Sequence, residues 1–214
     1  MFLRIFFLIF LDLLINEFKP CIIILERIMM RRSAWFYPGE IAELAVATIV
    51  VYLVFLSIAG WRFNPTYLTY VFLLSFLVYI PHELAHKFTA MYYGLPARYK
   101  LIKEFFLLTL ISAIPFMPIK IIVPGTVLIY MTWPVSKETN GVISAAGPIT
   151  NLLIGLVALV IGGPFARVLA EISGWIAFFN LIPFGPLDGK KILEWNGLIW
   201  LILFAFSAYL AFIA

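Results

Sequence analysis

The sequence predicts an all-α polytopic membrane protein, a bundle of about five to six transmembrane helices with a short re-entrant helix and β-hairpin element. Of its 214 residues, 64% are hydrophobic and only 12% are charged, whereas soluble domains carry roughly 25% charged residues. Its mean hydropathy is +1.06. Several apolar stretches approach the roughly 20 residues that a helix needs to cross a bilayer, and the segments between them are too short for a separate soluble domain.

The charge balance points to membrane topology rather than to a nucleic-acid partner. The net charge is +4 and the isoelectric point is about 9.2. The 15 Lys and Arg residues are scattered over short loops, as expected for loops that flank membrane spans. We therefore predict no nucleic-acid site. The single cysteine, Cys21, excludes an internal disulfide and is expected to act as a small apolar residue.

Residues 1–35 are predicted to form a separate N-terminal segment, and residues 36–214 the transmembrane domain. The N-terminal segment is apolar but interrupted by charges, a pattern that favours a pair of interfacial helices. A signal peptide is the weaker interpretation, because no small-residue cleavage site follows. A translation start at Met29 or Met30 would make the segment an artefact of start-site choice, and these alternatives stay open at this point.

Five apolar stretches are predicted to cross the membrane, at about residues 41–60, 67–93, 141–163, 169–187 and 197–213. The second stretch stops at Gly94, a residue typical of helix C-termini, and a loop with Arg98, Lys100 and Lys103 is predicted to follow. Between the second and third stretches, residues 104–131 are broken by Pro115 and Pro118 and turn at Pro124. Broken backbone at membrane depth is tolerated only where it lines a protein cavity, so we expect this region to re-enter rather than cross.

The distribution of basic residues favours the same topology. If residues 104–120 return to the side from which they came, nine basic residues lie on one side and two, Arg62 and Arg167, on the other. The nine are Arg27, Arg31, Arg32, Arg98, Lys100, Lys103, Lys137, Lys190 and Lys191. A full crossing reduces the bias to seven against four, so the positive-inside rule favours re-entry with a cytoplasmic N-terminal side.

The chemistry of the chain is predicted to lie in the motif His82-Glu83-Leu84-Ala85-His86, near the end of the second stretch. Two histidines four residues apart project from one face of a helix, as two ligands of one metal ion require. In the H-E-x-x-H pattern they bind Zn²⁺ and the glutamate is the general base of hydrolysis. These are the only two histidines in the chain. A histidine pair that is merely hydrogen-bonded within the bundle is the alternative.

Catalytic zinc usually takes three protein ligands, so a third is needed. The chain has two aspartates, Asp12 in the N-terminal segment and Asp188 at the end of an apolar stretch. With a re-entrant topology, Asp188 lies at the same membrane side as the histidines, whereas a full crossing would separate them. Asp188 is therefore the expected third ligand, and a turn residue before Gly189 is its alternative role.

Two further motifs accompany these residues. The run of prolines and glycines in "NLIPFGPLDG", residues 180–189, would interrupt a helix and free backbone groups that need a cavity or a neighbouring helix. The small residues of "AAGPITN", residues 145–151, suit close helix packing. Asn151 at its end is a polar side chain that needs a partner in lipid, with packing as the favoured role of the motif.

In their order and character, the three motifs resemble the site-2 protease family of intramembrane zinc metalloproteases, over about residues 36–196. The resemblance implies a minimal prokaryotic, archaeal-type member with no room for a PDZ domain. It implies that His82, His86 and Asp188 bind Zn²⁺ and that Glu83 is the base. It also implies that Asn180 binds substrate or stabilises the oxyanion.

The family's substrate-pairing β-hairpin would fall at about residues 121–131. A helical substrate must unwind before cleavage, and an exposed edge at Thr126, Val127 and Leu128 is expected to capture it as an extended strand. The expected partners are a transmembrane-helix protein substrate and the lipid bilayer, with the site near the cytoplasmic side of the cell membrane. The alternatives are an ion or metal transporter that uses the same His/Glu/Asp cluster and an inactive metal-binding scaffold. The sequence gives no oligomeric state.

Overall fold

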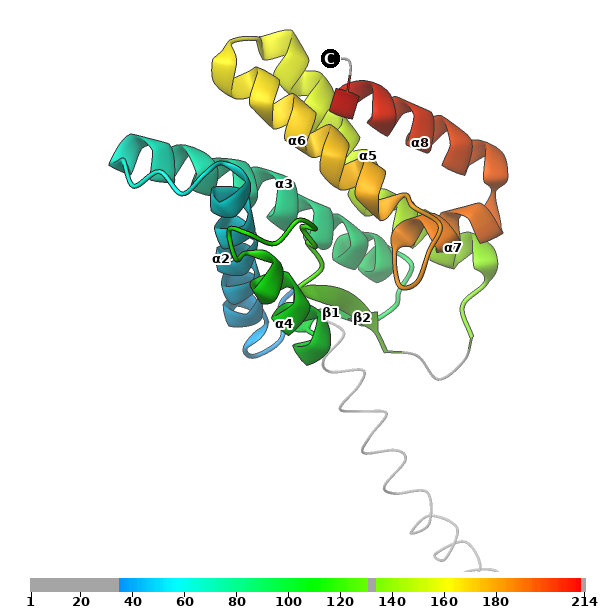
Figure 1. The fold of residues 1–214 in the computed structure, drawn as a ribbon. Coiled ribbons are helices and arrows are strands. Elements are labelled where there is room, and N and C mark those ends of the chain that lie inside the picture. The colour runs from blue at the N-terminus through cyan, green and yellow to red at the C-terminus, as the bar shows by residue number, and fades with distance from the viewer. Residues whose placement is uncertain (1–34, 131–133, 213–214) are drawn as a thin grey trace, which may run out of the picture. The chain divides into compact units, whose positions relative to one another are not determined.

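The computed structural model describes residues 35–130 and 134–212, and these are mostly helical (Figure 1). In chain order the elements are α2 (Glu40–Ile58), α3 (Pro65–Tyr92), β1 (Ala97–Leu101), α4 (Lys103–Ser112), β2 (Gly125–Ile129), α5 (Lys137–Ile161), α6 (Pro164–Asn180), α7 (Asp188–Trp195) and α8 (Gly197–Phe212). The described elements from α2 onward belong to one compact unit, Pro38–Ala214. The prediction for the N-terminal segment falls almost wholly outside the described residues.

Three helices, α2, α3 and α5, are long and apolar enough to cross a membrane. α6 has 17 residues, α8 has 16 and α4 has 10, all short of the roughly 20 residues that a span requires. The part of the chain that the structure describes therefore fits an all-α membrane protein, but not the five to six spans that the sequence predicts. α3 begins where Asn64 Oδ1 accepts hydrogen bonds from the amides of Thr66 (2.9 Å) and Tyr67 (3.3 Å), with Pro65 at the first helical position.

β1 and β2 pair antiparallel, with Ala97 opposite Ile129 and Leu101 opposite Gly125. The prediction of a hairpin within residues 121–131 is wrong, because only β2 lies there and its partner comes from a segment predicted as a loop. The physical reason lies in the backbone before β2. The amides of Ile121 and Val123 donate to the hydroxyls of Ser112 and Thr109 on α4. These two amides are therefore not available to a second strand of a hairpin.

α4 and residues 113–124 form an excursion that leaves the sheet after Leu101 and returns at Gly125. The two ends of the excursion are joined, since the Ile102 amide donates to the Pro124 carbonyl at 3.3 Å. The excursion therefore starts and ends at the same place, and its re-entry into a membrane stays a prediction. Lys120 fastens it by donating to Ser57 Oγ (2.7 Å) and to two carbonyls of the excursion, each 3.0 Å away.

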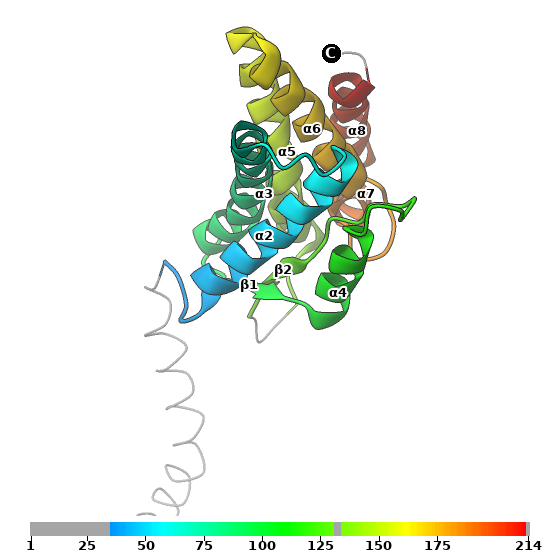
Figure 2. The same ribbon diagram turned by 60° about the vertical axis from the view of Figure 1, so that its left-hand side comes forward.

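Four helices pack closely around α5, namely α3, α6, α7 and α8 (Figures 1 and 2). Glycines allow these contacts. A Cβ at Gly155 of α5 would lie 3.3 Å from the Ala170 carbonyl of α6, and one at Gly174 of α6 would lie 2.6 Å from the Ala211 amide of α8. The predicted role of small residues in helix packing therefore extends well beyond the motif at residues 145–151.

Candidate metal centre

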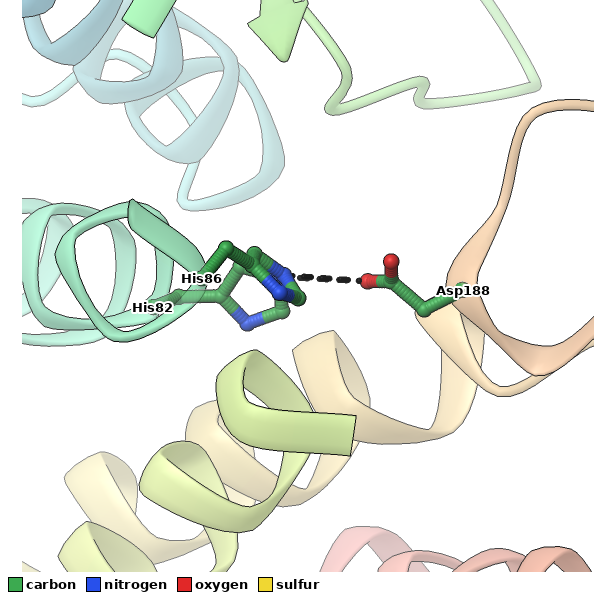
Figure 3. Close-up of side chains that lie close together, drawn as sticks. All are labelled: His82, His86 and Asp188. Carbon is green, nitrogen blue, oxygen red and sulfur yellow. Dashed lines mark hydrogen bonds and ion pairs between the residues drawn. The ribbon is translucent and has the colours of Figure 1, made fainter. Parts of the chain in front are cut away.

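His82 and His86 lie in the last third of α3, where their imidazoles project from one face of the helix (Figure 3). Both side chains are buried, with 4% and 8% of their surface exposed. The two Nε2 atoms are 3.1 Å apart and the two rings are nearly perpendicular, at 79°. The spacing of the motif therefore brings the two nitrogens to one point, as the sequence predicts.

Asp188 approaches the imidazoles from the opposite side, at the first residue of α7 (Figure 3). Its Oδ2 lies 3.2 Å from His86 Nε2 and 3.7 Å from His82 Nε2. The structure therefore brings together the three residues that the sequence singles out as zinc ligands. They come from α3 and α7, which are separated by about half of the chain.

The spacing of the three donor atoms fits a tetrahedral metal site. Zinc–ligand bonds of about 2.0 to 2.1 Å at tetrahedral angles place neighbouring donors about 3.3 to 3.4 Å apart. The three observed distances, 3.1, 3.2 and 3.7 Å, bracket that value. These are the only grouped metal-binding side chains among the residues that the structure describes. Two imidazoles and one carboxylate are also a donor set used by catalytic zinc, with the fourth position left open.

α5 supports the two imidazoles from behind. His86 Nδ1 lies 2.8 Å from the Ile143 carbonyl and can donate to it when Nδ1 carries the ring hydrogen. In that tautomer Nε2 has a free lone pair with which to bind a metal. Gly147 lies against both rings, because a Cβ there would collide with His86 Nε2 and would lie 2.7 Å from His82 Cε1. The sequence assigned the motif around Gly147 to helix packing and missed this contact with the site.

The turn between α6 and α7 fixes the position of Asp188. Gly189 packs against the Leu181 carbonyl, leaving no room for a side chain at residue 189. Burial would raise the pKa of Asp188, but its contacts with His86 and His82 outweigh burial and hold the pKa well below its usual value. The carboxylate is therefore ionised at neutral pH, as a metal ligand must be.

Glu83 and the three candidate ligands line one cavity of about 70 Å³. The Glu83 side chain is buried, with 9% exposure. Asn180 also lines the cavity, and its Nδ2 donates to the Ile176 carbonyl at 2.9 Å. From β2, Thr126 and Val127 line the cavity and Leu128 does not. All the predicted site residues except Leu128 therefore surround one space.

The outer edge of β1 is covered by α2. Tyr99 and Leu101 point their amides away from β2, and these donate to Glu40 Oε1 (2.7 Å) and Glu43 Oε2 (2.8 Å). Arg98 and Lys100 also contact Glu43 Oε1, at 2.8 and 3.1 Å. The sequence missed both glutamates because nothing in α2 predicts that it meets a strand. No further strand can pair with this edge.

The outer edge of β2 has a different environment. Backbone groups alternate in direction along a strand, so Gly125, Val127 and Ile129, which lie opposite the outward-facing residues of β1, direct their N–H and C=O groups away from the sheet. The same three residues line the cavity. Among the described residues the sheet has only two strands, so the edge over the cavity has no strand partner.

A second cavity, of about 510 Å³, lies between α2, α3, α6 and the end of the excursion. Its lining is mainly apolar, with Lys120 and Glu171 as charged exceptions. Ile122 and Ile176 line both cavities. The large apolar space therefore adjoins the small polar one.

Comparison with known proteins gives two similar curated relatives, both from Methanocaldococcus jannaschii. One, named "Putative zinc metalloprotease MJ0611", is 29% identical over 181 residues, which are 78% of this chain and 90% of the relative. The other, named "Zinc metalloprotease MJ0392", is 28% identical over 156 residues, which are 69% of this chain and 40% of the relative. No family model matches the chain, and no solved structure matches it.

These similarities and the donor geometry agree. Two relatives carry names that include zinc metalloprotease, and the chain places two imidazoles and a carboxylate where one ion can bind them all. The chain is thus similar to zinc metalloproteases, and these findings together support Zn²⁺ as its metal.

Proposed function

We propose that the chain is an intramembrane zinc endopeptidase of the site-2 protease type, which hydrolyses peptide bonds in transmembrane segments of other proteins. One observation carries the proposal: His82 and His86 from α3 meet Asp188 from α7 in a cavity that Glu83 also lines. A multi-pass position in the cell membrane, with the site near the cytoplasmic side, is part of the proposal. The three long apolar helices and the distribution of basic residues support it.

The proposed reaction is peptide hydrolysis by an activated water. His82, His86 and Asp188 would hold a zinc ion, which would lower the pKa of a bound water to about 7 and polarise a carbonyl oxygen. Glu83 accepts the proton of the attacking water and returns it to the leaving nitrogen. Asn180, at the rim of the same cavity, is proposed to bind the substrate backbone or to stabilise the developing oxyanion with its amide.

The substrate is proposed to bind as an extended strand along the outer edge of β2. A helical segment hides its carbonyls in internal hydrogen bonds, so it must unwind before a peptide bond can reach Glu83. In this proposal the pairing uses the backbone groups of Gly125, Val127 and Ile129, because those of Thr126 and Leu128 face β1. Strand addition at one edge only would also fix the direction from which the peptide approaches.

The second cavity supports a route for the substrate from lipid. It is mainly apolar and large enough for several side chains, and it adjoins the catalytic cavity at Ile122 and Ile176. A transmembrane segment between α2 and α6 could keep its apolar side chains out of water while its unwound end reaches β2. Lys120 holds the excursion against Ser57 of α2 at this place, so we propose this junction as the place that moves when substrate is admitted.

The deciding test is Glu83→Gln, which keeps the size and hydrogen-bonding capacity of the side chain and removes the base. The protein is reconstituted in liposomes with a single-span reporter whose apolar segment contains a Gly-Asn pair. The variant should keep its zinc and lose cleavage, and Glu138→Gln, at an exposed position in the first turn of α5, should cleave like the unmodified protein. Retained cleavage by Glu83→Gln rejects the peptidase proposal.

The same experiment separates the rival functions. A metal transporter or an inactive metal-binding scaffold would use the cluster without proton transfer to a leaving nitrogen. Both predict that Glu83→Gln leaves the biological activity of the chain largely intact. Both also predict that neither the unmodified chain nor Glu83→Gln cleaves the reporter. Metal uptake into protein-containing liposomes, measured alongside cleavage, identifies the transporter directly.

A further inference from the structure

A pair of buried tyrosines links the catalytic cavity to the sheet. The hydroxyls of Tyr79 on α3 and Tyr99 on β1 are 2.7 Å apart, and either can be the donor. The two rings pack edge to face, with an interplanar angle of 89°. Their exposed fractions are only 3% and 1%, so bulk water does not compete for this hydrogen bond. Burial of a hydroxyl costs free energy unless the group has a hydrogen-bond partner.

Tyr79 continues this pair to Glu83. The two residues lie four positions apart on α3 and therefore share one face of the helix, and both line the catalytic cavity. Across this single helical turn the Tyr79 hydroxyl can reach the Glu83 carboxyl. The order that uses both hydroxyl hydrogens has Tyr99 donating to Tyr79 and Tyr79 donating to Glu83. We propose that Tyr79, backed by Tyr99, is a positioning residue that aims the Glu83 carboxylate at the attacking water.

Tyr99 is itself fixed from a third element. Its amide donates to Glu40 Oε1 on α2, and the same oxygen accepts a hydrogen bond from Lys87 Nζ at 2.6 Å. Lys87 lies on α3, directly after His86. The chain of contacts from Glu83 through the two tyrosines and Glu40 to Lys87 therefore begins and ends on α3, on either side of His86. Such a closed set holds a side chain more rigidly than a single hydrogen bond does.

The tyrosine pair also reaches the edge proposed to bind substrate. A Cβ at Gly125, the first residue of β2, would collide with the Tyr99 hydroxyl and would lie 2.7 Å from Tyr99 Cζ. Burial and the nearby Glu83 charge raise the pKa of Tyr99, so its hydroxyl keeps its hydrogen at neutral pH. The same phenol therefore lies under the start of the substrate edge and behind the base, and it fixes the distance between them.

This inference rests on the proposed function of Glu83, and its test is Tyr79→Phe, which removes one oxygen and leaves the ring. We expect kcat for the liposome reporter to fall about 10- to 100-fold, the range typical of partners that orient a catalytic group. KM, zinc content and the visible spectrum of the cobalt-substituted protein should stay unchanged. Tyr52→Phe, on α2 and lining neither cavity, is the matched control and should retain full activity.

Tyr99→Phe gives a second and independent reading on a different element. It should lower kcat less than Tyr79→Phe, and the double variant should be no slower than Tyr79→Phe alone, because both hydroxyls act through one contact. Unchanged kcat in Tyr79→Phe overturns the inference, as does a fall in kcat that is matched by lost zinc or a changed cobalt spectrum. If Glu83→Gln cleaves, the proposed function fails; if Glu83→Gln is inactive but Tyr79→Phe cleaves at the unmodified rate, this inference fails alone.

Discussion

The last turns of α3 and the α5–α6–α8 contact are buried in opposite ways. In α3, the described structure buries His82, Glu83, His86 and Lys87 within six residues, and an acidic or tyrosine partner lies beside each of them. At the α5–α6–α8 contact, glycines let helix backbones approach closely, with few polar contacts. One region uses paired charges and the other uses shape.

Close packing of small residues and burial of paired charges have different effects on the protein. Close helix packing through small residues stabilises a bundle by van der Waals contact and tolerates modest changes in side chains. Buried ion pairs stabilise little, because desolvation offsets most of their attraction, but the loss of one partner is severe. The paired charges of α3 therefore specify geometry, and they occur where the proposed chemistry needs it. The predictions that follow would break this contrast or sharpen it.

The largest effect is expected for Lys87→Met, which leaves Glu40 as a buried charge without its ammonium partner. Both side chains have 0% exposure, and removal of one member of such a pair costs about 3 to 5 kcal/mol of unfolding free energy. Unfolding in detergent, followed by circular dichroism, measures the change. Lys103→Met, at an exposed position in α4, is the matched control, and equal stability of the two variants would contradict the contrast.

Asp188→Ala should act on zinc rather than on folding. It removes one of the three candidate ligands, which lies on the eight-residue helix α7, so we expect zinc affinity to fall by about 100-fold or more, while the helical content stays unchanged. Competition with a chelator, read by metal analysis, measures the affinity. Glu194→Ala lies exposed on the same helix and should bind zinc normally. Undiminished zinc in Asp188→Ala would remove this residue from the site.

The candidate ligands could be predicted from the sequence because they lie in short motifs. Two histidines four residues apart can be placed on one helical face without a structure, and Asp188 followed from the scarcity of aspartates and from the topology. The contacts that orient these residues come from elsewhere. Gly147 meets the imidazoles through the packing of α5, and Glu40 of α2 meets Tyr99 and Lys87 beside the site. No local pattern in the sequence predicts such long-range contacts.

The fold was predicted less completely, for two physical reasons. Apolar stretches do not reveal where a helix stops, so α6 ends at Asn180, before the predicted limit of residue 187, where two prolines interrupt the backbone. Strand pairing depends on partners far apart in the sequence, so β1 was predicted as a loop although it completes the sheet. The break in residues 104–120 was predictable because prolines act locally.

Two glycines of α5 give the smallest and sharpest comparison, because they are eight residues apart on one helix and belong to the two regions. Gly147→Ala would push a methyl group into both imidazoles, while Gly155→Ala would meet Leu210 Cδ1 at 3.1 Å and the Ala170 carbonyl at 3.3 Å. We expect Gly147→Ala to weaken zinc binding about tenfold through displaced ligands, and Gly155→Ala to cost about 1 kcal/mol of stability with zinc unchanged. Both are read by the same chelator competition and unfolding titration. Equal effects of the two variants on zinc would show that the site responds to any strain in α5. The proposed difference between the last turns of α3 and the α5–α6–α8 contact would then be wrong.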